Sequence, residues 1–151
     1  ANNSKPQDKD VEAIIERNIR LVISMIGNHR PPTVFAQEPL RLLWLQTYDT
    51  ILTPIPISKL LQGVQKALPI IQNGKGILCY CAQGRHHSVA MGASILVSMG
   101  YSTEEAMDYL RAQRKVAHPQ AWHIQRHIEQ FEELWQPQNE QPIQVPANPE
   151  A

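Results

Sequence analysis

Cysteine, aromatic residues and long apolar runs are all scarce in this chain. Its 151 residues include two cysteines, Cys79 and Cys81, and only 6% aromatic residues. Side chains two apart on a strand project in parallel, so this pair is poorly placed for a disulfide, and we expect a reducing, cytoplasmic setting. No apolar run approaches the ~18 residues that cross a bilayer, and the N-terminus ANNSKPQDKD lacks the apolar core of a signal peptide. The sequence therefore predicts a soluble protein with no membrane partner.

An excess of charge of one sign is also missing. The 14 Lys and Arg residues balance the 14 Asp and Glu residues, which leaves a formal net charge of +0. This balance argues against nucleic acid or an anionic membrane surface as the main partner. Any attraction for anions must then be local, and nothing in the sequence indicates the oligomeric state.

The chain has enough apolar residues, 42%, for one substantial core. We expect a single domain over residues 11–135. Residues 1–10 are polar and are predicted to be a flexible N-terminus. Residues 136–151 are rich in Pro, Gln and Asn and have too little apolar surface to fold alone, which predicts a disordered tail.

Apolar, β-branched segments alternate with segments of helical periodicity along the domain. Three strands are predicted, at Ile19–Ile26, Arg41–Leu45 and Ile77–Cys81. Helices are predicted at Val11–Asn18, Ser58–Ile71, Ser88–Met99, from Ser102 to about Lys115, and from Pro119 onward. Ser102 and Glu105 form a capping box, and Gly100 stands where a helix ends. This alternation predicts an α/β fold with helices on both faces of the sheet and the ligand site at the carboxyl ends of the strands.

The most informative stretch is Gly76–Gly100, where an apolar run leads through a short loop into an apolar helix. The first turn of a helix has N–H groups without partners and a partial positive charge, so the loop before it can hold a phosphate. The same field makes a cysteine at that place nucleophilic. Cys81 stands at the start of the loop, which suggests covalent catalysis on an anion.

The segment Tyr80–Ser88, Tyr-Cys-Ala-Gln-Gly-Arg-His-His-Ser, resembles the signature His-Cys-x-x-Gly-x-x-Arg-Ser of the cysteine-based protein tyrosine phosphatases, and more closely their dual-specificity branch. Cys81 matches the nucleophile of that motif, Gly84 its glycine and Ser88 its serine. The resemblance extends from about Ile14 to Trp135. It implies a central, mainly parallel sheet of four to five strands flanked by helices.

Upstream, the segment Tyr48-Asp49-Thr50 is similar to the general-acid segment of the same family. The implied reaction is attack of the Cys81 thiolate on phosphorus, with Asp49 protonating the leaving oxygen and later activating water. Ser88 would stabilise the departing sulfur. The implied phosphate-binding residues are Ala82, Gln83, Gly84, Arg85, His86 and His87. The resemblance implies no metal and no cofactor, and a phosphorylated protein or small phosphorylated molecule as partner.

Two positions depart from the motif. His87 stands where the family has the arginine that clamps the phosphate, and histidine is shorter and offers one reachable donor. Tyr80 replaces the histidine that precedes the nucleophile. Arg85 is long enough to swing inward as a substitute. The sequence thus leaves open a phosphatase of impaired activity and a pseudophosphatase that binds phosphate or a phosphoprotein without turnover.

Other patterns near the loop have less specific explanations. A second frame runs from Cys79 to Arg85, but it lacks the pivot glycine, and we interpret Cys79 as a small buried hydrophobe. A metal site built from the two cysteines and His86 and His87 is disfavoured, because a strand and a tight loop place them poorly for tetrahedral ligation.

Basic residues further along the chain are assigned to the surface. His123 and His127 are predicted to lie on a solvated helix face, because the glutamate of a metalloprotease helix is absent. Arg111, Arg114 and Lys115 are predicted to form an exposed helix end that complements the helix dipole.

Overall fold

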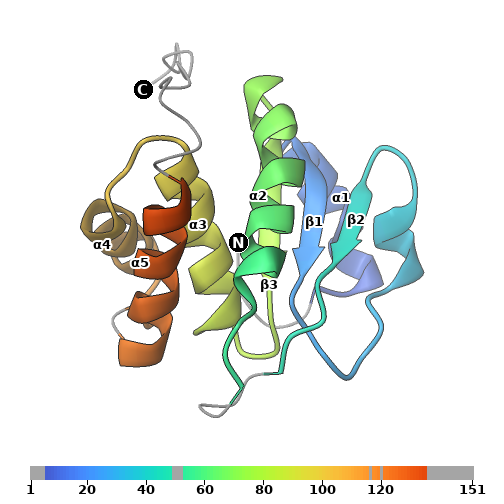
Figure 1. Cartoon of the computed structure of the whole chain (residues 1–151). Coiled ribbons are helices and arrows are strands. Elements are labelled where there is room, and N and C mark those ends of the chain that lie inside the picture. The colour runs from blue at the N-terminus through green and yellow to red at the C-terminus, as the bar shows by residue number, and fades with distance from the viewer. Residues whose placement is uncertain (1–5, 49–52, 116, 120, 136–151) are drawn as a thin grey trace.

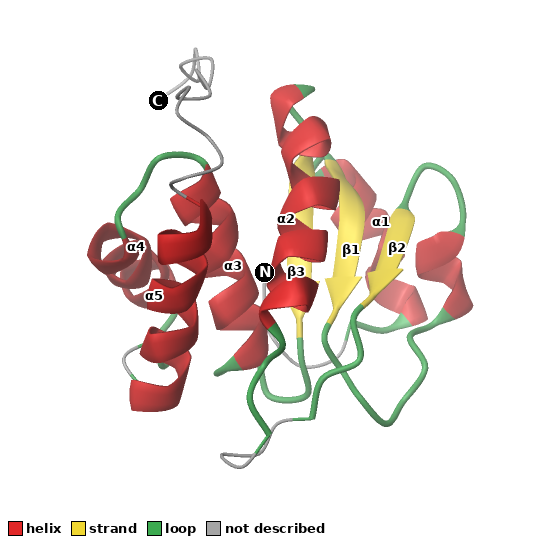
Figure 2. Cartoon of the chain, in the orientation of Figure 1, coloured by secondary structure: helices red, strands yellow, loops and turns green. Residues whose placement is uncertain are grey.

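The computed structural model describes residues 6–48, 53–115, 117–119 and 121–135 (Figure 1). It has an α/β architecture in which a small sheet carries helices on both faces (Figure 2). The predicted tail, residues 136–151, and the first five residues lie outside this description, and so does the candidate acid Asp49. None of the helices in these ranges has the length and apolar character that crossing a bilayer requires.

The sheet has three strands in its described part: β1 (Ile19–Ser24), β2 (Arg41–Trp44) and β3 (Gly76–Tyr80). Their order is β2-β1-β3, and β1 pairs with both neighbours in parallel. The positions of the three strands confirm the sequence prediction, but the expected total of four to five strands is wrong. The described residues 6–18 before β1 supply no strand, because they form the 3-10 helix η1 (Asp8–Asp10) and the helix α1 (Val11–Glu16).

The two faces of the sheet have separate cores. On one face, α2 (Ile57–Gln72), α3 (His87–Ser98) and α5 (Trp122–Trp135) enclose the larger core, and α4 (Thr103–Gln113) packs outside α3. On the other face, α1 and η2 (Thr33–Ala36) cover a smaller core. Figure 1 shows α2 in front of the sheet and α1 behind it. Helices on both faces are the arrangement that the alternation of segments predicted.

Local signals at the helix ends match the structure closely. The Ser102 hydroxyl accepts a hydrogen bond from the Glu105 N–H at 3.2 Å, and the Glu105 carboxylate accepts one from the Ser102 N–H at 2.8 Å. Gly100 follows the C-cap of α3 with a φ of 105°, the left-handed conformation that glycine favours. The capping box and the helix stop are therefore both confirmed.

The polarity of the elements brings the candidate site together. The three strands are parallel, so their carboxyl ends lie at one edge of the sheet. Figure 1 shows the first turns of α3 and α5 at this same end of the molecule. The loop between β3 and α3 therefore lies where two helix N-termini carry partial positive charge.

Candidate functional site

Cys81 follows directly after β3 and is almost fully buried, with 1% of its surface exposed. The Gly84 N–H donates a hydrogen bond to its Sγ at 3.1 Å, and Ser88 Oγ lies 3.3 Å from the same sulfur. Hydrogen bonds from an amide and a hydroxyl stabilise negative charge on sulfur. The structure thus brings together three of the residues that the motif singled out.

Gly84 makes the turn of this loop. Its φ is 65°, in the left-handed region where a residue with a Cβ costs about 1–2 kcal/mol. Its carbonyl accepts a hydrogen bond from Arg114 Nη2 at 3.1 Å, and the next carbonyl, that of Arg85, accepts one from the His118 N–H at 3.1 Å. In a trans peptide the N–H points away from the C=O, so the N–H groups of Arg85 and His86 face the other side of the loop. Successive amides turned to one side form an anion-binding nest.

The remaining side chains of the loop lie at its rim. Ala82, Gln83 and Arg85 are exposed, and His86 is half-buried. Ala82, Gln83 and Arg85 thus present their side chains to the outside, while their backbone forms the loop.

His87, at the position of the motif arginine, is 3% exposed and hydrogen-bonded to a distant residue. Its Nδ1 lies 2.7 Å from the hydroxyl of Thr47, which follows β2. The Thr47 hydroxyl donates its only proton to the Met25 carbonyl oxygen at 2.6 Å, so it accepts from the His87 Nδ1–H. His87 therefore ties the loop to the segment that leads toward Asp49. No pattern in the sequence marked Thr47, because its partner lies 40 residues away.

Asp49 itself lies outside the described residues. The residues before it, Thr47 and Tyr48, are described, and Tyr48 is 57% exposed. The assignment of Asp49 as general acid therefore stays a prediction.

Arg114 corrects a sequence expectation. It was predicted to be part of an exposed helix end, but it is half-buried and its guanidinium holds the Gly84 carbonyl. Burial lowers the pKa of Arg114, while the charge of Cys81 acts in the opposite direction. A residue just beyond the end of α4 contributes to the loop because the chain folds back onto it.

His127 corrects a second expectation. It was assigned to a solvated helix face, but only 9% of it is exposed, and its Nε2 accepts a hydrogen bond from the Ile55 N–H at 3.3 Å. Burial and the neighbouring ring of His123 lower the pKa of His127, although the side chain of Gln130 acts in the opposite direction. Both histidines and His87 line a cavity of about 390 Å³. The helical spacing of His123 and His127 was visible in the sequence, but the segment that covers them was not.

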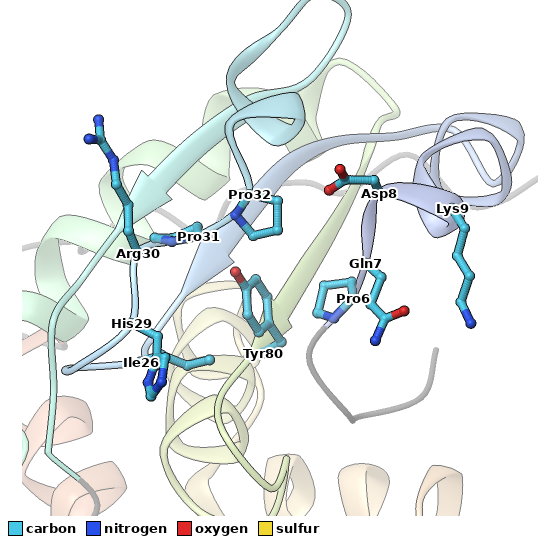
Figure 3. Close-up of a pocket in the computed structure, with 10 residues that line it drawn as sticks. All are labelled: Pro6, Gln7, Asp8, Lys9, Ile26, His29, Arg30, Pro31, Pro32 and Tyr80. Atoms are coloured by element: carbon cyan, nitrogen blue, oxygen red, sulfur yellow. The ribbon is translucent and has the colours of Figure 1, made fainter.

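The two residues before Cys81 face opposite sides of the sheet, Cys79 with the larger core and Tyr80 with the smaller one. Burial raises the pKa of the Cys79 thiol to about 12, and the charge of Cys81 acts in the same direction, so Cys79 is a protonated thiol at neutral pH. Tyr80 belongs to the core on the other face of the sheet and lines a separate pocket with Pro6 and Pro32 (Figure 3). Neither side chain replaces the histidine that the family motif places before the nucleophile.

No metal centre is evident in the described ranges, where no group of three or more His, Cys, Asp or Glu side chains is placed to hold an ion. This statement includes the four histidines around the loop. His86 and His123 contact each other through their rings, with centroids 5.2 Å apart.

Comparison with solved structures shows which known proteins share this fold. No family model and no curated protein sequence matches the chain. Among solved structures, human DUSP28 is similar with a TM-score of 0.73 and 19% identity, covering 85% of this chain and 87% of that one. PTPMT1 in complex with PI(5)P has a TM-score of 0.72 and 20% identity, over 87% and 90% of the two chains.

A third similar structure is a human tyrosine phosphatase-like serine/threonine/tyrosine-interacting protein. Its TM-score is 0.73 and its identity 18%, over 85% of this chain and 86% of that one. Identities this low establish architecture only. The fold of this chain is that of the dual-specificity phosphatases.

Proposed function

We propose that the chain is a phosphomonoester hydrolase of the protein tyrosine and dual-specificity type that works through a phosphocysteine intermediate. The observation that carries the proposal is the environment of Cys81 Sγ, which receives the Gly84 N–H at 3.1 Å and has Ser88 Oγ at 3.3 Å. A buried sulfur with these two neighbours, at the start of an amide-lined loop, is arranged for attack on an anion held above it.

The reaction divides into two displacements. The Cys81 thiolate attacks phosphorus in line, the ester oxygen leaves, and Asp49 donates the proton that this oxygen takes up. Water then attacks the phosphocysteine, Asp49 accepts its proton, and phosphate and the thiolate are released. Ser88 donates a hydrogen bond to the departing sulfur. The loop amides bind the phosphoryl oxygens, and the reaction requires no metal and no cofactor.

The departure at His87 lowers the expected rate. An arginine at this position presents two parallel donors to the phosphate and is always charged. His87 gives its Nδ1–H to Thr47 instead, so at most Nε2 is left to face an anion. We therefore propose an enzyme with weaker transition-state stabilisation than the motif normally provides. Its substrate is a phosphorylated protein or a small phosphorylated molecule. The PI(5)P bound to one similar structure is consistent with the second class.

A binding module is the second candidate. The hydrogen bond between His87 and Thr47 favours it, because it commits the clamp position to holding the fold together. One structural neighbour is named as a phosphatase-like interacting protein, which is in keeping with such a role. On this alternative the loop binds a phosphorylated partner and does not release phosphate.

Hydrolysis of 4-nitrophenyl phosphate by three proteins tests the proposal: the wild type, Cys81→Ser and the matched control Cys79→Ser. We expect Cys81→Ser to lower kcat/KM by at least about a thousandfold, because it removes the nucleophile. Cys79→Ser should retain the wild-type rate within a small factor, since that thiol is protonated and outside the loop. Equal rates for all three proteins would show that Cys81 is not the nucleophile. Saturable binding of phenyl phosphate without phosphate release would support the binding module instead.

A further inference from the structure

A groove follows the open edge of the sheet. β3 is the outermost strand in the order β2-β1-β3, and no described residue forms a strand on its other side (Figure 2). The groove beside it has a volume of about 490 Å³ and is enclosed by β3, α3, α4 and the end of α2. Its wall is largely apolar and includes Ile77, Ile95, Leu96, Met99 and Leu110. The reaction proposed at Cys81 does not use this groove.

The backbone of β3 turns hydrogen-bonding groups toward the groove. The Tyr80 carbonyl accepts a hydrogen bond from the Met25 N–H at 2.9 Å, so the backbone of Tyr80 faces β1. Successive residues of a strand direct their N–H and C=O groups to alternate edges. The N–H and C=O groups of Ile77 and Cys79 therefore face away from β1, where the described residues provide no backbone partner. A strand edge of this kind is a template for an extended segment.

Cations surround the groove. Arg17, Lys75 and Arg114 are among its lining residues, and no Asp or Glu occurs in the lining that the structure describes. Two copies of the chain joined along this edge would bring their cations together, which disfavours a dimer here. Residues 1–5, Ala-Asn-Asn-Ser-Lys, carry a further cation and almost no apolar surface. The groove therefore fits an extended segment that is apolar and carries negative charge.

The predicted tail contains such a segment. Residues 136–151 include two glutamates and no Lys or Arg. Residues 142–146 read Pro-Ile-Gln-Val-Pro, and in an extended chain Ile143 and Val145 project to the same face. Proline is tolerated at the first residue of a strand, and a second proline ends the ladder because it has no N–H. This sequence can thus supply a short extended segment with one apolar face.

The tail begins close to the groove. In the last turn of α5, the Glu132 carboxylate accepts a hydrogen bond from the Thr103 hydroxyl at 2.7 Å. Thr103 is the first residue of α4, and Met99, four positions earlier, lines the groove. Four residues span at most about 14 Å, whereas residues 136–142 reach up to about 23 Å when extended. The tail is therefore long enough to enter the groove at this end.

Entry at this end sets the direction of the segment. Met99 follows α3, Lys75 precedes β3, and both line the groove, so the segment enters where β3 begins and runs parallel to it. Its connection to β3 includes α3 and α5, which lie on the sheet face that α2 also covers. The connection from β2 to β3 through α2 crosses the sheet in the same direction on this face, so both connections have the same hand (Figure 1). Parallel strands joined by helices share one hand almost without exception.

We propose that the tail binds in this groove, with residues 143–145 extended along the open edge of β3. Ile143 lies beside Ile77, and Val145 lies beside Cys79. Both apolar side chains of the tail point into the groove, because laterally paired residues of parallel strands share a face. The tail lies outside the predicted domain, so the domain keeps its three strands and gains a segment bound at the edge. The inference does not depend on catalysis.

This register satisfies the backbone groups at the strand edge. The Ile77 N–H donates to the Pro142 carbonyl, a bond that needs no N–H from the proline. The Cys79 N–H donates to the Gln144 carbonyl, and the Gln144 N–H donates to the Ile77 carbonyl. Glu140 then lies near the basic end of the groove, where β3 begins, and opposite charges attract.

Amide hydrogen exchange, followed by NMR on the whole chain, tests the inference. In the wild type, the Ile77 and Cys79 N–H groups should exchange at least about tenfold more slowly than in Val145→Glu, which puts a carboxylate into the apolar groove. Gln144→Glu is the matched control, because it adds the same charge one residue away on the opposite face. It should leave both rates at their wild-type values. The Leu78 N–H faces β1 and should stay slow in all three proteins, which verifies the fold.

Three results would overturn the inference. Fast exchange at Ile77 and Cys79 in the wild type would show that the edge is open. Equal rates in the two variants would show that the predicted face of the segment does not matter. Slow exchange that depends on protein concentration would identify a second copy as the occupant instead of the tail of the same chain. None of these measurements depends on turnover, so the proposed hydrolysis is tested separately.

Discussion

The two ends of the loop between β3 and α3 differ in the residues that their side chains contact. At the Cys81 end, the sulfur has its neighbours within the loop itself, the Gly84 N–H at 3.1 Å and Ser88 Oγ at 3.3 Å. At the His87 end, the ring is 3% exposed and its partner is Thr47, which follows a different strand. At one end the sulfur has the neighbours expected for a nucleophile, and at the other the residue in the position of the motif arginine contacts a distant part of the fold.

The contacts at the Cys81 end are made within one short loop, whereas the contact at the His87 end joins segments that are far apart in the sequence. The Cys81 environment follows from a short segment with a left-handed glycine, so a sequence that keeps those residues keeps the geometry. In the motif the phosphate clamp is a single long side chain, and in this chain His87 at that position contacts Thr47. Substitutions at the two ends therefore have opposite expected effects on activity.

The largest gain in activity is expected from His87→Arg. A guanidinium restores two parallel donors to the phosphoryl oxygens, and we expect kcat/KM for 4-nitrophenyl phosphate to rise about a hundredfold. His29→Arg is the control, because it adds the same charge at an exposed position after β1. An unchanged or lower rate for His87→Arg, with a folded protein, would contradict the assignment of this position as the lost clamp.

Ser88→Ala tests the role of the hydroxyl next to the Cys81 sulfur. Loss of the hydroxyl 3.3 Å from Sγ removes a hydrogen bond to the departing sulfur, which should slow breakdown of the phosphocysteine about tenfold. A burst of nitrophenol in stopped-flow measurements reports this change. Ser94→Ala is matched, since Ser94 is buried in the same helix but donates only to the Ala90 carbonyl. Equal burst kinetics in the two variants would exclude the role proposed for Ser88.

Arg114→Gln tests the contribution of the hydrogen bond between the Arg114 guanidinium and the Gly84 carbonyl. The change leaves the Gly84 carbonyl without its guanidinium donor and should lower the free energy of unfolding by about 1–2 kcal/mol. Urea denaturation measures this difference. Arg111→Gln, on the exposed part of α4, should have a negligible effect. Similar losses in both variants would show that Arg114 acts only as surface charge.

The smallest effect is a pH dependence from His127. Its pKa is lowered in the folded protein, chiefly by burial, so the unfolded chain binds a proton first as the pH falls below its ordinary value of about 6.5. The contribution of His127 is present above that pH and is lost below it. His127→Gln should therefore reduce the loss of stability between about pH 7.5 and about pH 5.5. The same loss in wild type and variant would mean that other groups cause it.

Much of the fold and part of the candidate site could be predicted from local patterns in the sequence. The three strands, the capping box at Ser102 and the stop at Gly100 depend on nearby residues and were predictable. The number of strands was not, because it came from a resemblance and the segment before β1 is helical here. The contacts that give the site its particular character span 40 residues for His87 and 30 for Arg114. No periodicity or short motif encodes such pairs.

Direct detection of the intermediate tests the central claim. The wild-type protein is mixed with 4-nitrophenyl phosphate, quenched in acid within its first turnover, digested and examined by mass spectrometry. We predict one phosphoryl group on the sulfur of Cys81, and none on the Cys79 sulfur of the same peptide. Phosphate release without any phosphorylated Cys81, or a phosphoryl group at another residue, would contradict the assignment of this sulfur as the nucleophile.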